Sequence, residues 1–304
     1  MELIKPDINV NFVGHIKGAL IFSLIVIGIS LISLIIKGGP RYGIDFEGGT
    51  LVQVKFFNEV DISEVRIALD DLTIEGLSVQ EFGEKEANEY LITMTKTTGE
   101  LEGLSEDVKI ALNNRFGRES LEVRRVEMVG PKVGKDLRRK GMLAVIFSLL
   151  GMLMYIWWRF ELRFGVGAII CLIHDVIITL GALSLTNKPV DLPIIAALLA
   201  VVGYSVNDTI IISDRIRENL KKMSRGRLRD IVNKSINQTL SRTCITAGTT
   251  LMVVIALFSL GGEVIHDFAF TLLVGICIGT YSSIFIASPL LIVWERIFPK
   301  KKRR

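Results

Sequence analysis

Asp208 is the residue of this sequence whose surroundings most suggest chemistry, because it is a carboxylate inside a long apolar stretch. An ionisable side chain at the centre of a membrane-spanning helix costs roughly 2.5 to 3.5 kcal/mol on insertion scales, so it indicates a function by default. Ser205, Asn207 and Thr209 surround it within one helical turn. A carboxylate that can change its protonation state inside a bilayer is what a proton relay requires.

Arg242 is the expected charge partner of Asp208. It opens a later apolar stretch, and Thr246, Thr249 and Thr250 follow at helical spacings that place all four residues on one face. A carboxylate paired with Arg242 could stay charged, whereas an unpaired one would protonate. Asp208 and Arg242 are therefore predicted to form the proton relay, with Thr246 and Thr250 in support.

His174 and Asp175 form a second polar island within an apolar stretch. Two interpretations remain open for this pair: hydrogen bonds that join neighbouring helices, and a place on an ion path. The small residues Gly203, Gly275 and Gly279 are predicted to allow close approach of helices.

The chain is predicted to cross a membrane six times. Half of its 304 residues are hydrophobic, which is rare for a soluble domain of this length. A span needs about 20 apolar residues. The first covers residues 16–36 and is interpreted as retained, because no small-residue cleavage site follows it. Five more are expected near 142–158, 164–186, 193–213, 243–262 and 268–293.

Residues 50–130 predict an α/β domain with the element order β-α-β-β-α-β, the ferredoxin-like pattern. Alternating apolar residues mark strands at 51–57, 77–82, 90–96 and 121–129. Asp61 is expected to cap the first helix and Ser105 the second. The segment from 37 to 140 contains 20 acidic and 16 basic residues, an ordinary solvated surface that gives no sign of nucleic-acid binding.

The Lys and Arg residues of the short loops predict that both termini lie in the cytoplasm and the α/β domain outside. Lys132 to Lys140 oppose this orientation, but charges that follow a long translocated domain carry little weight. The predicted divisions are a cytoplasmic segment 1–15, the first span 16–36, the outer domain 37–140, spans two to six within 141–293 with a basic cytoplasmic loop 214–242, and a basic tail 294–304.

Soluble-enzyme chemistry has no support in the sequence. The three cysteines, Cys171, Cys244 and Cys277, each lie in an apolar run and form neither a disulfide framework nor a metal motif. No phosphate-binding loop of the GxxxxGK[ST] type, HExxH motif or Ser-His-Asp constellation occurs. We expect no enzyme activity, no cofactor and no metal site.

Several motifs together resemble the SecF family, the smaller subunits of SecDF protein-export pairs. They are spread in order over nearly the whole chain: Tyr42-Gly-Ile-Asp-Phe-Glu-Gly-Gly-Thr50, Val129-Gly-Pro-Lys-Val-Gly134, His174-Asp-Val-Ile-Ile-Thr179, Val202-Gly-Tyr-Ser-Val-Asn-Asp208, Asp214-Arg-Ile-Arg-Glu-Asn219, Gln238-Thr-Leu-Ser-Arg-Thr243 and Gly279-Thr-Tyr-Ser-Ser-Ile-Phe-Ile-Ala287. The motif with Gly43, Asp45, Gly48 and Gly49 is interpreted as a backbone turn into the outer domain, since glycine readily adopts positive φ.

The resemblance implies half of an RND (resistance-nodulation-division) transporter bundle in the inner membrane, working with SecD beside the SecYEG channel and using the proton-motive force to promote export of unfolded preproteins. It implies YajC and a membrane insertase as further partners, and it places Asp208 and Arg242 on the proton path at the SecD interface. The basic loop separately predicts either contact with anionic lipids or a plain positive-inside anchor. Two other functions stay open: a small-molecule transporter half of the same architecture, and a scaffold that conducts nothing.

Overall fold

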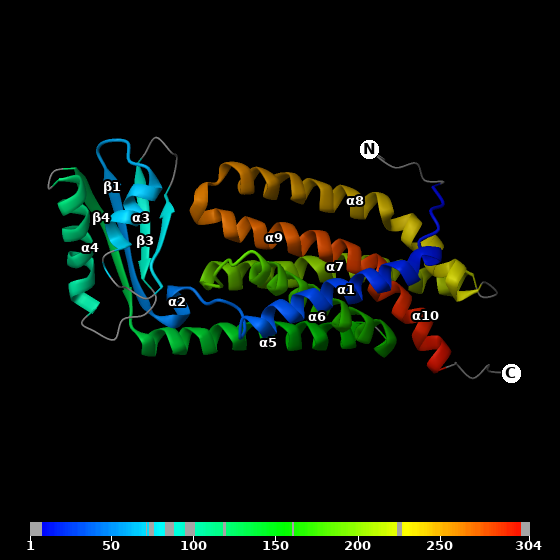
Figure 1. Ribbon diagram of the computed structural model, residues 1–304. Coiled ribbons are helices and arrows are strands. Elements are labelled where there is room, and N and C mark those ends of the chain that lie inside the picture. Colours follow the sequence, from blue (N-terminus) through cyan, green and yellow to red (C-terminus); the bar gives the residue numbers. More distant parts are fainter. Residues whose placement is uncertain are drawn as a thin grey trace.

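The computed structural model describes residues 8–70, 72, 76–82, 88–94, 101–117, 120–159, 161–223 and 227–298. An α/β domain lies at one end of an elongated helical bundle, and the described N-terminal segment and α10 (Ser288–Ile297) lie at the other end (Figure 1). We call the end with α10 the far end and the end with the α/β domain the domain end.

The α/β domain has the predicted ferredoxin-like topology. Its elements are β1 (Gly49–Phe56), α3 (Ile62–Asp70), β2 (Ser78–Glu81), β3 (Glu89–Met94), α4 (Leu101–Phe116) and β4 (Leu121–Val129). The sheet order is β2-β3-β1-β4, and all three strand pairs are antiparallel. Alternate residues of β1 and β3, such as Val52, Val54 and Ile92, are buried in a common apolar core with Val65 and Leu112 of the helices.

The two predicted helix caps had different outcomes. Asp61 Oδ1 accepts hydrogen bonds from the N–H (2.8 Å) and the hydroxyl (2.5 Å) of Ser63. These bonds hold the pKa of the Asp61 carboxyl below its usual value, because they favour the charged form. Ser105 is not a cap, since α4 already begins at Leu101 and Ser105 lies inside it. An apolar stripe locates a helix more reliably than it locates the first turn.

Six helical segments are long and apolar enough to span a membrane, as predicted. They are α1 (Ile16–Ile36), α5 (Pro131–Arg159), α6 (Leu162–Leu185), α7 (Leu192–Lys222), α8 (Leu228–Leu260), and α9 (Gly262–Ser282) continued by the π-helical η3 (Ser283–Ala287) and α10. Pro289 lacks the N–H that would bond the carbonyl of residue 285, which accounts for the change of helix type just before it.

At two predicted boundaries the helices extend beyond the apolar stretches. Residues 131–140, assigned to the outer domain by the sequence, form the first turns of α5. The expected loop 214–242 consists mostly of the ends of α7 and α8. Glu218 stabilises the α7 extension by accepting from Arg215 and Lys222, each at 2.5 Å and at helical spacing. Apolar content therefore underestimates helix length at water-exposed ends.

The helices α6, α7 and α9 form the interior of the bundle, and α1, α5 and α8 lie at its rim. Of the most apolar 18 residues of each span, about half are buried in α6 (56%) and α7 (50%). Only 17% of them are buried in α1 and in α8, and 11% in α5. Gly181 of α6 allows close approach of α1, because a Cβ there would lie 2.2 Å from the Cβ of Ser30. The rim helices leave wide apolar faces for lipid or a partner.

Candidate functional site

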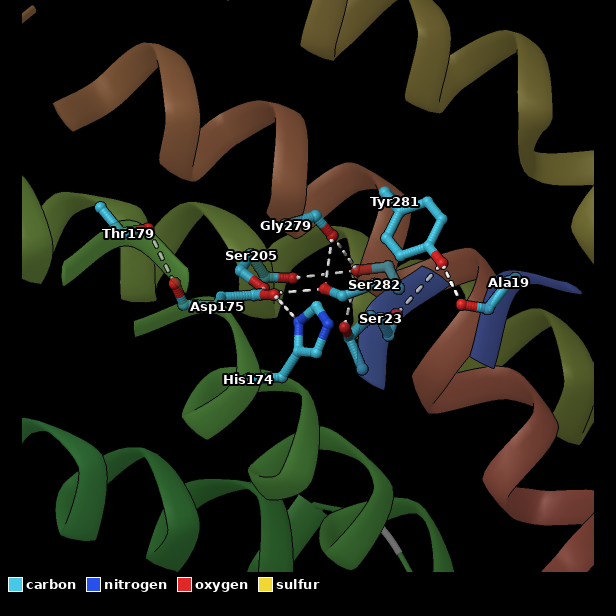
Figure 2. Close-up of polar contacts among 11 residues, drawn as sticks. Ala19, Ser23, His174, Asp175, Thr179, Ser205, Gly279, Tyr281 and Ser282 are labelled. Atoms are coloured by element: carbon cyan, nitrogen blue, oxygen red, sulfur yellow. Dashed lines mark hydrogen bonds and ion pairs between the residues drawn. The ribbon is translucent and has the colours of Figure 1, made fainter. Parts of the chain in front are cut away.

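Asp175 lies at the meeting point of three interior helices and is 1% exposed. Its Oδ2 accepts hydrogen bonds from Ser205 Oγ of α7 (2.6 Å) and from Ser282 Oγ of α9 (2.9 Å) (Figure 2). Its Oδ1 lies 2.9 Å from His174 Nδ1, which donates in the tautomer that carries hydrogen there. A buried carboxylate is tolerated when its oxygens are satisfied in this way. The helix-joining interpretation of this pair therefore has direct geometric support.

His174 connects this cluster to α1. Its ring stacks on Tyr281 with centroids 6.5 Å apart, and the Tyr281 hydroxyl donates to Ala19 O of α1 (2.6 Å) and lies 3.1 Å from Ser23 Oγ (Figure 2). The other ring nitrogen, Nε2, is buried and has no hydrogen-bond partner in the described part of the chain.

Asp208 is equally buried, at 1% exposure, but its environment is different. Neither of its carboxylate oxygens has a hydrogen-bond partner among the described residues. No ion pair within 4 Å joins it to Arg242 or to any other described cation. The hydroxyl of Tyr204, one turn earlier on α7, is likewise buried and has no hydrogen-bond partner within the part of the chain that the structure describes. A carboxylate without any donor is the group whose charged form costs most in a bundle.

Hydrogen bonds fix α7 on both sides of Asp208. Ser205 bonds Asp175, and Thr209 Oγ1 lies 2.8 Å from Ser283 Oγ of the π-helical segment. Gly279 of α9 allows α7 to approach at Ser205, because a Cβ at position 279 would lie 3.0 Å from the Cβ of Ser205. Asn207, which the sequence grouped with these residues, is exposed on the outside of α7. Gly203 also faces open space and is no packing site, unlike Gly279.

The Arg242 stripe lies on a rim helix. Arg242 and Thr249 of α8 are exposed, and Thr246 and Thr250 are half-buried. The hydroxyls of Thr249 and Thr250 donate to backbone carbonyls of their own helix, at 2.8 and 2.9 Å. The stripe therefore presents Arg242 and Thr249 on a face that the described residues leave open.

The glycine motif forms the junction between α1 and the α/β domain. Gly43 precedes α2 (Ile44–Glu47), a single turn that includes Asp45, and Gly48 ends it with φ of +83°. Gly49 also has positive φ, +151°. A Cβ at Gly48 would lie 2.9 Å from Pro131 Cα at the start of α5. The positive φ angles of Gly48 and Gly49 disfavour other residues at this turn.

The polar side chains that join α1, α6, α7 and α9 around Asp175 form a polar seam. Four of its residues were not predicted as site residues: Ser23, Tyr281, Ser282 and Ser283. Serines at successive positions of an apolar span were a signal, but a serine often bonds its own helix. Within the described residues no three His, Cys, Asp or Glu side chains gather as metal ligands.

Together, the fold and the seam define a class: a multi-pass membrane protein with a ferredoxin-like domain and a buried polar centre. Residues 108–297 match the family described as protein export membrane protein SecD/SecF, C-terminal, and residues 32–56 match the SecD/SecF GG motif. The chain is 48% identical to protein translocase subunit SecF of Calditerrivibrio nitroreducens over 294 residues, which cover 96% of each chain. It is 46% identical to that of Vibrio alginolyticus over 292 residues, 95% of this chain and 91% of the relative.

The chain belongs to the SecF family of protein translocase subunits. The crystal structure of SecDF from Thermus thermophilus matches with a TM-score of 0.82 and 36% identity, over 97% of this chain and 40% of that chain. A second SecDF structure, in a super-membrane-facing form, matches with a TM-score of 0.70. This chain thus spans two fifths of the length of the SecDF chains it resembles.

Proposed function

We propose that this chain is the SecF half of a SecDF-type machine that uses the proton-motive force to promote protein translocation. The observation that carries the proposal is Asp208, a carboxylate buried in a spanning helix with both oxygens unpartnered in the described chain. Such a group must take up a proton or gain a partner from elsewhere, and either event changes the balance of forces in the bundle. Moving one charge through 100 mV supplies about 2.3 kcal/mol.

SecD is the proposed partner on the α8 side of the bundle. The SecDF chain of the Thermus thermophilus structure is more than twice as long as this chain, which matches 40% of its length. Arg242 and Thr249 lie exposed on α8, and Arg242 opens the apolar stretch of that helix, where a cation that faces lipid is unfavourable. A second helical half that covers this face would bury the stripe and bring acidic or polar groups to Arg242.

The remaining partners follow from the same role: the SecYEG channel, an unfolded preprotein, YajC and a membrane insertase. Anionic lipids are proposed at the far end, where exposed cations such as Arg227, Arg229 and Lys234 gather at the start of α8. Each basic residue near an anionic surface contributes about 1 kcal/mol.

The proposed orientation places the far end in the cytoplasm and the α/β domain outside the inner membrane. Basic residues concentrate at the far end, from Arg215 to Lys222 on α7 and after Arg227 on α8. In intact cells, a cysteine at Gln80 of β2 should react with an impermeant maleimide, and one at Lys222 only after permeabilisation. The reverse labelling pattern would contradict the orientation.

Asp208→Asn tests the proton-coupled step. The substitution preserves volume and hydrogen-bonding capacity but cannot ionise. It should leave the chain abundant and associated with SecD while abolishing the stimulation of export by a proton gradient in membrane vesicles. Translocation driven by ATP alone should persist. Asp214→Asn is the matched control, since Asp214 is an exposed carboxylate six residues later on α7 that pairs with Arg159 at 3.8 Å.

Arg242→Met should have an effect similar to that of Asp208→Asn, and the double variant should be no worse than either single one if the two residues act as a unit. Full gradient-dependent export with Asp208→Asn would contradict the proposal and favour a non-conducting scaffold. Normal protein export together with sensitisation to small toxic compounds would favour a small-molecule transporter.

A further inference from the structure

The junction between α1 and the α/β domain is joined directly to the start of α7. Residues 41–43 pair with the end of the α6–α7 loop: Gly43 N donates to Val190 O (2.8 Å), and Val190 N donates to Arg41 O (2.7 Å). Asp45 Oδ2 accepts from the backbone N–H of Leu192 at 3.1 Å. Leu192 is the first residue of α7, so Asp45 satisfies one of the free N–H groups of that helix from another segment.

Asp191 caps the same helix end from within. Its Oδ1 accepts from Ile194 N at 3.1 Å. Two carboxylates therefore meet the same first turn, where the helix dipole favours negative charge. Gly43 makes the approach possible, because a Cβ there would lie 3.2 Å from the Cβ of Asp191.

The turn α2 is held on its other side by α5. A Cβ at Gly134 would lie 2.9 Å from both Gly48 N and Phe46 O, so only a glycine lets α5 pass this closely. Phe46 is 2% exposed and packs with Leu183, Val190 and Ile194 at the domain ends of α6 and α7. The turn thus lies between α5 and α7 and touches both through backbone and core contacts (Figure 1).

We propose that Asp45 and Asp191 are positioning residues that form a latch between the α/β domain and α7, the helix that carries Asp208. The coupling rests on the proposed proton-driven function. Asp208 lies 16 residues beyond Leu192, about 24 Å along a rigid helix. Because Asp45 of the junction turn α2 bonds the first turn of α7, a movement of the domain that carries α2 with it breaks this contact or moves α7. Domain position and the environment of Asp208 are thereby linked.

The charged groups around the latch make it sensitive to pH. Burial above all, together with the negative charges of Asp45 on α2 and Asp267 on α9, raises the pKa of the Asp191 carboxyl to about 6, against the lowering effect of the hydrogen bond from Ile194 N. Asp267 is itself bonded by Lys188 and lies beside His266. On the α5 side, Arg138 lies over the Tyr42 ring, 4.1 Å from its centroid.

The sign of the pH effect follows from this environment. The pKa of Asp191 in the latched form, about 6, is above its ordinary value of 3.8. The latched form therefore binds the proton more tightly, and its stability is greatest below about pH 4 and falls as the pH rises through about 6. Acidification on the side of the domain should close the latch, and neutral pH should loosen it.

The test measures the distance between the domain and the bundle in the full chain. Gln80 of β2 and Thr186 after α6 line the same groove of about 390 Å³ between the two parts, so spin labels on cysteines at these positions report their separation. Cys171, Cys244 and Cys277 are first replaced by serine or alanine in the labelled protein. Pulsed dipolar spectroscopy in lipid nanodiscs then gives the distance distribution at pH 5 and pH 8.

Asp45→Ala should increase the population of separated conformers about fivefold, as expected for loss of one hydrogen bond of about 1 kcal/mol. Asp45→Asn retains an acceptor for Leu192 N and should keep the wild-type distribution at pH 5, where its lost charge matters least. Asp191→Asn remains a good cap but cannot ionise, so it should remove the difference between pH 5 and pH 8. Glu47→Ala is the matched control, since Glu47 belongs to the same turn but is exposed.

An unchanged distribution in Asp45→Ala, or a pH response that survives Asp191→Asn, would overturn the latch. This measurement needs neither SecD nor a proton gradient, so its failure is separate from failure of the proposed function. Coupling to that function is read from gradient-driven export, which Asp45→Ala should reduce and Asp45→Asn should restore. If export is insensitive to Asp208→Asn while Asp45→Ala still separates the domain, the proton mechanism fails and the latch stands.

Discussion

Asp175 and Asp208 are two carboxylates buried to the same degree in the same bundle, yet their surroundings are opposite. Asp175 is contacted by Ser205, Ser282 and His174. Asp208 has no hydrogen-bond partner among the described residues. Only one turn of α7 separates Ser205, which bonds Asp175, from Asp208. The difference shows that burial alone does not assign a role to a membrane carboxylate.

The two environments suit different tasks. A carboxylate held by donors from several helices fixes their relative positions, and its removal leaves those donors unpaired. A carboxylate without donors contributes little to packing and instead responds to protons, water or a partner chain. In this bundle the satisfied site adjoins the unsatisfied one, so a change in the state of Asp208 acts on a helix that the Asp175 cluster joins to α6 and α9.

The largest expected effect that separates the two carboxylates is on stability. Asp175→Ala should lower the free energy of unfolding by about 3 kcal/mol, because it leaves the Ser205 hydroxyl and His174 Nδ1 without their acceptor in a buried site and leaves Ser282 only the carbonyl of Gly279. Asp208→Ala should change it by no more than about 1 kcal/mol, since no bond within the described chain is lost. Thermal or denaturant unfolding of the full chain in detergent measures both. Equal losses of unfolding free energy in the two variants would contradict the proposed difference between Asp175 and Asp208.

A smaller effect is expected for the donors of the cluster. Ser282→Ala should cost about 1 kcal/mol, because Asp175 loses one of its contacts but keeps those from Ser205 and His174. Thr249→Ala on α8 is the matched control and should stay within about 0.5 kcal/mol, since its exposed hydroxyl bonds only its own helix. A Ser282 effect no larger than that of Thr249 would mean that the bond to Asp175 contributes nothing measurable.

Both the spans and the α/β domain could be predicted from the sequence because their signals are local. The first span was expected at residues 16–36, where α1 lies. Strand alternation and helix stripes also gave the ferredoxin-like order, since each depends only on residues a few positions apart. Helix ends were predicted less well, as α7 and α8 show, because charged residues continue a helix that hydropathy no longer marks.

The sequence also marked Asp208 and Asp175 as unusual, because an acidic residue in an apolar stretch is visible without a fold. It could not distinguish them. Only the tertiary structure brings Ser205, Ser282 and His174 to Asp175 and leaves Asp208 without a donor, and only it joins Asp45 to Leu192, 147 residues later in the chain. Hydrogen bonds between helices depend on the rotation and crossing of each helix, and those are fixed by the packing of the whole bundle.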